Sequence, residues 1–82
     1  MMEKRLLRVE TDPKADAIYI ELLDLGISHS EELDDNRIID RSLDGRTVGV
    51  DLLAVSEGVK LEGLPEAELV KGILVGLGIS VY

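Results

Sequence analysis

The chain has 82 residues, in which 17 aspartates and glutamates face 9 lysines and arginines, so its formal net charge is −8 at pH 7. That charge repels phosphate backbones and anionic lipid headgroups, which argues against nucleic-acid and membrane partners. The absence of cysteine excludes disulfides, thiolate-metal clusters and thiol nucleophiles. The length predicts one domain, residues 1–82, with a single small core.

The ends of the chain carry no targeting signal that we recognise. Residues 1–5 lead directly into an alternating segment, without the apolar region of a signal peptide. The longest apolar stretch, residues 73–79, is far shorter than the roughly 20 residues that span a bilayer. We therefore expect a soluble, cytoplasmic protein, and no residue pattern indicates a cofactor.

The first predicted elements are two strands. Apolar and polar residues alternate over 7–11 and again over 18–22, which is the period of a half-buried strand. Asp12 and Pro13 interrupt the pattern, because proline fixes its own φ and disfavours the helical region for the residue before it. The alternation places Tyr19 on the face opposite to the apolar one. We predict a hairpin.

The next segment, residues 27–36 (ISHSEELDDN), loses this alternation and gathers carboxylates. A charge run of this kind is typical of a solvated edge or loop. Residues 37–40 and 46–53 then alternate again, with the turn sequence SLDG between them. Two hairpins laid side by side would form an antiparallel meander of about four strands, apolar on one face.

The last third predicts a helix that covers this apolar face. Pro65 suits the first helical position, an apolar stripe recurs at helical spacing over residues 69–77, and Gly78 can end the helix in a left-handed cap. Residues 79–82 suggest a short terminal strand. Gly72 and Gly76 predict a groove of small residues where the helix approaches the sheet, or else a dimer contact. The fold class is α+β.

Residues 40–51 (DRSLDGRTVGVD) allow two interpretations. Asp40, Ser42, Asp44 and Gly45 match the first half of a calcium-binding loop, and Asp51 falls near its closing position. An aspartate is shorter than the usual closing glutamate, and the flanking segments read as strands instead of helices. Since each strand residue advances about 3.3 Å, Asp51 would lie far from the turn. The sequence favours a hairpin with its turn at Asp44 and Gly45.

Two stretches of the sequence resemble the DUF2283 family of small bacterial and archaeal proteins. They are TDPKADAIYIEL, which begins at Thr11, and LDGRTVGVD, which begins at Leu43. The similarity covers about residues 7–56 and implies the fold more than an activity, because the family has no established function. Genes of this family are often described beside small toxin-like genes, so the resemblance implies an antitoxin or toxin-neutralising role, which no residue of this sequence indicates. Ser42 and Asp51 stand where many relatives have an acidic residue and a glutamate, which further weakens the calcium interpretation.

These observations leave three hypotheses for function. The first is a non-enzymatic interaction module that binds a basic protein partner, for which the family resemblance implies an antitoxin-like role. Its partner-binding residues would be Tyr19, Glu31, Glu32, Asp34 and Asp35. The second is a calcium- or small-ligand-binding protein.

The ligands of that second candidate would be Asp40, Asp44 and Asp51. The third hypothesis is a structural homodimer. No catalytic residue is predicted, because the single histidine, His29, has no triad context.

Overall fold

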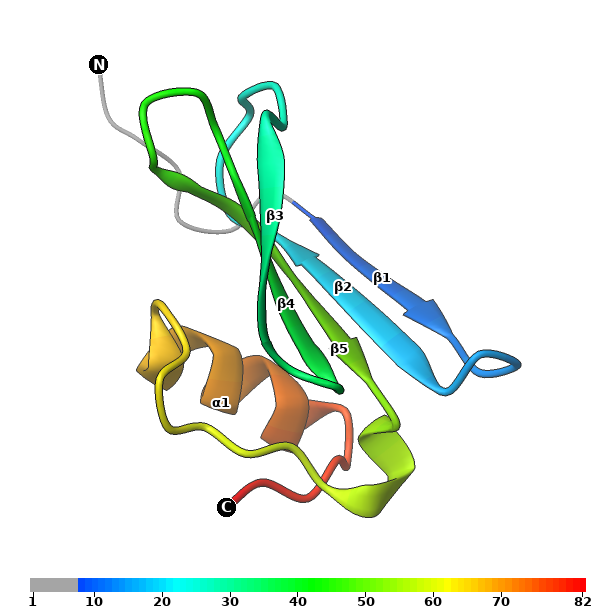
Figure 1. The fold of residues 1–82 in the computed structure, drawn as a ribbon. Helices are drawn as coiled ribbons and strands as arrows, with labels where there is room; N and C mark the ends of the chain where they lie inside the picture. Colours follow the sequence, from blue (N-terminus) through cyan, green and yellow to red (C-terminus); the bar gives the residue numbers. More distant parts are fainter. Residues whose placement is uncertain (1–7) are drawn as a thin grey trace.

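The computed structural model describes residues 8–82. The strand predicted to begin at residue 7 therefore starts partly outside the described residues. The fold is a five-stranded antiparallel sheet with one helix on one face (Figure 1). The strands are β1 (Arg8–Asp12), β2 (Ala17–Glu21), β3 (His29–Asp34), β4 (Arg37–Arg41) and β5 (Thr47–Leu53). A 3-10 turn (Val55–Glu57) and the helix α1 (Ala67–Gly76) follow.

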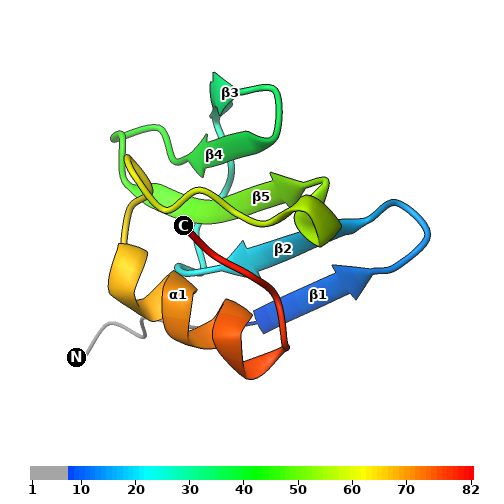
Figure 2. The same cartoon turned by 90° about the horizontal axis from the view of Figure 1, so that it is seen from below.

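The strand order is β1-β2-β5-β4-β3, so the sheet is not the simple meander predicted from the sequence. The last strand in the chain, β5, lies between β2 and β4, and Figure 2 shows the strands side by side in this order. The predicted count of four strands is wrong by one. The extra strand is β3, which forms from the acidic segment at one edge of the sheet.

Both predicted hairpins are confirmed. β1 pairs with β2 with Thr11 opposite Ile18, and β4 pairs with β5 with Ile39 opposite Val50. The second hairpin turns at Gly45, whose φ of 88° lies in the left-handed region that glycine adopts without a steric penalty. The segment 40–51 is thus two extended strands and a tight turn.

The core lies between one sheet face and α1. Ile20, Val50 and Leu52 of the sheet meet Val70 and Leu74 of the helix, and each of these side chains is fully buried. In Figure 2, α1 lies against this face, and β3 is the strand farthest from it. Burying such side chains is worth about 1.5–3 kcal/mol each, so this contact is a main source of the stability of the domain.

The helix ends as predicted but begins later. Gly78 has a φ of 80°, and the amides of Gly78 and Ile79 donate to the carbonyls of Val75 and Leu74, which is a Schellman cap. The start at Pro65 is wrong. The helix begins at Ala67, because the residue after the proline adopts a left-handed conformation instead of a helical one.

Two further predictions for this region need correction. Gly72 and Gly76 do not contact the sheet, because a Cβ atom on either would meet nothing within 4 Å. The groove hypothesis is therefore wrong, and the dimer contact stays a prediction. The predicted terminal strand is reduced to one parallel bridge between Val59 and Val81. No helix among residues 8–82 has the length and apolarity needed to cross a bilayer.

Candidate functional site

The sheet face opposite α1 carries the most unusual group of side chains in the described part of the molecule. Tyr19 of β2 lies directly opposite Asp51 of β5, and Gly49 of β5 lies opposite Asp40 of β4. All four residues share this face, because side chains alternate along a strand and their neighbours point into the core. We call Tyr19, Asp40, Gly49, Asp51 and Ser30 of β3 the outer-face cluster.

The side chain of Tyr19 crosses over the neighbouring strand β5 to reach Asp40 on β4. Its hydroxyl donates a hydrogen bond to Oδ2 of Asp40 at 3.0 Å, although β5 lies between β2 and β4. The ring can cross only because Gly49 has no side chain. A Cβ atom at that position would lie 2.2 Å from the Tyr19 hydroxyl oxygen and 2.5 Å from Cζ. Glycine within a strand often marks such a close approach, so Gly49 is a required part of the cluster.

Asp40 joins three strands through one carboxylate. Its Oδ1 accepts a hydrogen bond from the Ser30 hydroxyl at 2.6 Å, while Oδ2 accepts the bond from Tyr19. Hydrogen bonds to a charged acceptor are stronger than those between neutral groups. The cluster therefore connects the edge strand β3 to β2 near the centre of the sheet.

Electrostatics on this face favour a cation. Burial raises the pKa of the Asp51 carboxyl, and the negative charge of Asp40 raises it further. Burial, followed by the hydrogen bond to Asp40, also raises the pKa of Tyr19 above its ordinary value, so its hydroxyl stays protonated at neutral pH. Among the described residues, no lysine or arginine forms an ion pair with Asp40 or Asp51. A cationic group at this position would lower the free energy of both carboxylates.

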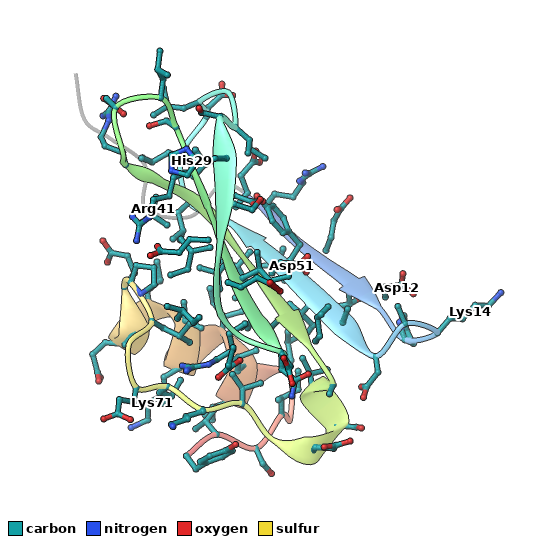
Figure 3. The ribbon with its side chains drawn as sticks, in the orientation of Figure 1. Asp12, Lys14, His29, Arg41, Asp51 and Lys71 are labelled. Carbon is teal, nitrogen blue, oxygen red and sulfur yellow. The ribbon has the colours of Figure 1, made fainter. Side chains whose placement is uncertain are left out.

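The three candidate calcium ligands do not converge. Figure 3 shows Asp51 over the middle of the sheet, and Asp40 lies on the adjacent strand. Asp44 is at the end of the hairpin, where it accepts hydrogen bonds from the hydroxyl of Ser42 and from Arg46. The first of these bonds is the main reason why the pKa of Asp44 lies below its ordinary value. Within residues 8–82, no group of three or more His, Cys, Asp or Glu side chains could hold a metal ion.

The predicted partner-binding residues fall in two places. Tyr19 belongs to the outer-face cluster, as described, whereas the four acidic candidates lie on β3 or just after it. Glu31 forms an ion pair with Arg41 at 2.9 Å, and Glu32 is exposed. Asp34 and Asp35 are at the turn that leads into β4. The sequence placed all four in one charge run, but the structure separates them into different environments.

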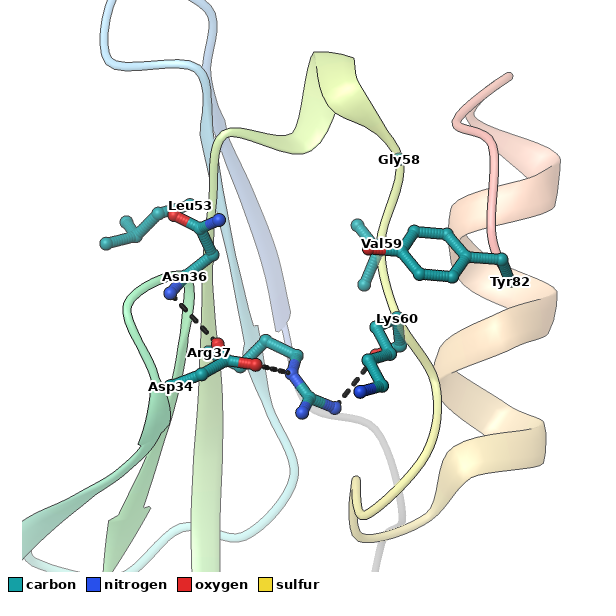
Figure 4. A pocket seen from close by; sticks show the side chains of 8 residues that line it. All are labelled: Asp34, Asn36, Arg37, Leu53, Gly58, Val59, Lys60 and Tyr82. Atoms are coloured by element: carbon teal, nitrogen blue, oxygen red, sulfur yellow. Dashed lines mark hydrogen bonds and ion pairs between the residues drawn. The ribbon is translucent and has the colours of Figure 1, made fainter.

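Asp34 is part of a structural contact. Its carboxylate accepts a hydrogen bond from the Asn36 amide, which is the main cause of its lowered pKa, and it pairs with the Arg37 guanidinium at 2.9 Å. Arg37 is 8% exposed, and its Nη1 donates to the carbonyl of Lys60 (Figure 4) and to that of Glu62. The adjoining cavity has a volume of about 50 Å³, room for one or two waters. Arg37 therefore fastens the segment after β5 to β4.

The first hairpin turn is also structural. Asp12 caps the turn, because its side chain accepts a hydrogen bond from the Ala15 amide at 3.1 Å. Asp16 has a φ of 55° and accepts bonds from the amide and the hydroxyl of Ser56, at 3.0 and 2.7 Å. The turn is thereby joined to the 3-10 segment that follows β5.

Sequence reasoning found Tyr19 but missed its contacts. The sequence indicated Asp40 only as a metal ligand and indicated no role for Ser30. The one available signal was Gly49, a glycine within a strand pattern, which indicates that another group comes close. His29 itself is an exposed residue of β3.

Comparison with known proteins gives one match. No curated protein and no solved structure is similar enough to this chain to be matched. The model of a family described as a protein of unknown function, DUF2283, matches residues 8–56, which include all five strands and the whole outer-face cluster. The chain belongs to the DUF2283 family.

Proposed function

We propose that this protein is a non-enzymatic binding module whose outer-face cluster and the carboxylates around it bind a basic segment of another protein. The observation that carries the proposal is the pair Asp40 and Asp51. These two carboxylates share a sheet face with a half-buried tyrosine and have no ion-pair partner among the described residues. Negative surfaces of this kind attract basic partners and raise their association rates.

Tyr19 is the expected centre of the contact. Tyrosine combines a large apolar ring with a polar tip, and such residues dominate the binding energy of many interfaces. Its hydrogen bond to Asp40 fixes the ring over Gly49, so little rotamer entropy is left to lose on binding.

We further propose a cellular location and a biological role for the protein. The sequence features support a cytoplasmic location, where a protein without cysteine needs no oxidative folding. If the basic partner is a toxin whose activity the protein suppresses, the protein acts as an antitoxin.

The test is a pull-down of the tagged protein from its own cells at low and high salt. We expect one basic protein in stoichiometric amount, lost at high salt because exposed charge pairs are screened. The variant Asp51→Asn should retain much less of it. Glu68→Gln is the matched control, because it changes the net charge equally on the exposed side of α1. Equal recovery by both variants, or no basic protein at all, would contradict the proposal.

A further inference from the structure

The edge strand β3 has an unpaired side. It is the last strand of the sheet and pairs only with β4 within residues 8–82, so its outward amide and carbonyl groups have no strand partner in this part of the chain. Five of its six residues are exposed, and α1 lies at the other end of the sheet (Figure 2). Open edges of this kind can accept an additional strand from another chain.

The side chains of β3 favour a positively charged added strand. Its sequence, HSEELD, has three carboxylates and no lysine or arginine. Glu31 is paired with Arg41 and Asp34 with Arg37, but Glu32 forms no ion pair within residues 8–82. Glu32 points to the outer face, like Ser30 two residues before it, because strand side chains alternate.

A second copy of this chain is a poor occupant of the edge. Two β3 strands side by side would place carboxylates next to carboxylates, and like charges on adjacent strands are destabilising. An added strand with lysine or arginine would instead place positive charges next to these carboxylates, which is stabilising. Neighbouring strands lie about 4.8 Å apart, so a lysine on the added strand could reach Glu32 and Asp40 from the outer face.

We propose that the basic partner binds as an extended strand added to the open edge of β3, with its lysine or arginine side chains at alternate positions on the outer face. This inference rests on the proposed function and specifies how the partner is held. Backbone hydrogen bonds along β3 provide affinity, and the alternating cations provide the selection. The binding surface then extends from the edge of β3 over Ser30 to the other residues of the outer-face cluster.

The probe for the test is a capped peptide of alternating lysine and valine, long enough to span the six residues of β3. The control is the same peptide with every backbone amide methylated, which keeps the charge but removes strand pairing. Amide hydrogen exchange of the full chain is followed by NMR at low salt. At a peptide concentration of about 100 dissociation constants, every second amide of β3 should exchange about 100-fold more slowly.

The variants sharpen this test. Glu32→Gln should weaken the peptide about two- to fivefold, the effect of one exposed ion pair, whereas Glu68→Gln should not. Binding without slower exchange in β3, or equal binding of the methylated peptide, overturns strand addition but leaves the outer-face proposal in place. Absence of peptide binding overturns strand addition as well. The outer-face proposal fails separately, if Asp51→Asn leaves partner recovery unchanged.

Discussion

The two faces of one sheet show how the same strands serve different purposes. On the face toward α1, Ile18, Ile20 and Val50 are almost entirely buried and make only apolar contacts. On the opposite face, the residues between them include Tyr19 and Asp51, which are half-buried and polar. The covered face determines stability, while the outer face keeps charges that folding does not require. The predictions below test this division.

The largest effect is expected on the covered face. Ile20→Ala removes a side chain with no exposed surface and leaves a cavity, so the free energy of unfolding should fall by about 2–5 kcal/mol. Glu21→Ala, one residue later on the outer face, should change it by less than about 0.5 kcal/mol. Urea denaturation followed by circular dichroism measures both. Similar losses in the two variants would contradict the division.

Gly49→Ala should be the most damaging change on the outer face. The new Cβ would overlap the Tyr19 ring and would also lie 3.0 Å from the Ile20 carbonyl oxygen. Overpacking of this kind costs about 1–3 kcal/mol. The double variant with Tyr19→Ala should be more stable than the sum of the two single changes predicts, because the overlap disappears. Additive effects would show that Tyr19 does not cross β5 over Gly49.

A smaller loss in the free energy of unfolding is expected for Tyr19→Phe. The ring stays in place, but Asp40 loses one hydrogen bond, which is worth about 0.5–1.5 kcal/mol. The burial of Tyr19 and this hydrogen bond, which both raise its pKa, can be observed by titration. In the variant Tyr82→Phe, Tyr19 is the only tyrosine left, and its ultraviolet absorbance should show ionisation at a higher pH than the ordinary tyrosine value of 10.0. Ionisation at or below that value would exclude the buried hydrogen bond.

The smallest expected effect is a gain in stability, for the variant Asp51→Asn. Because the pKa of Asp51 is raised above 3.8 in the folded state, its charged form is disfavoured by folding, and the protein loses stability as pH rises through the folded-state pKa. Asp51→Asn removes this loss. The variant should therefore melt slightly higher than the original at pH 7, and the gain should vanish below about pH 3.8. A lower melting temperature at pH 7 would show that Asp51 is neutralised by a contact within the chain.

The alternation of apolar residues predicted four strands, the buried face and the position of Tyr19 correctly. It missed β3, because an edge strand exposed on both faces has no hydrophobic period to detect. Its hydrogen bonds to β4, together with the pairing of Glu31 with Arg41, hold these charged residues in a strand. The fold therefore uses a segment that local pattern alone assigns to a solvated edge or loop.

The contact between Tyr19 and Asp40 was beyond sequence reasoning for a different reason. It depends on β5 lying between β2 and β4, and strand order is a property of long-range packing. A meander would have placed Asp40 on the strand next to Tyr19, and Gly49 would then have had no role. The helix start was similarly decided by one backbone conformation, that of Glu66, which propensity does not predict.

The two bonds between Asp16 and Ser56 continue the pairing of β2 with β5 beyond the strands, because they tie the first turn to the segment just after the last strand. Ser56 is also the final residue that the family model matches. The matched residues therefore contain the whole sheet, whereas α1 lies beyond them. Protein engineers could replace α1 with a different apolar element over the covered face while leaving the outer face unchanged.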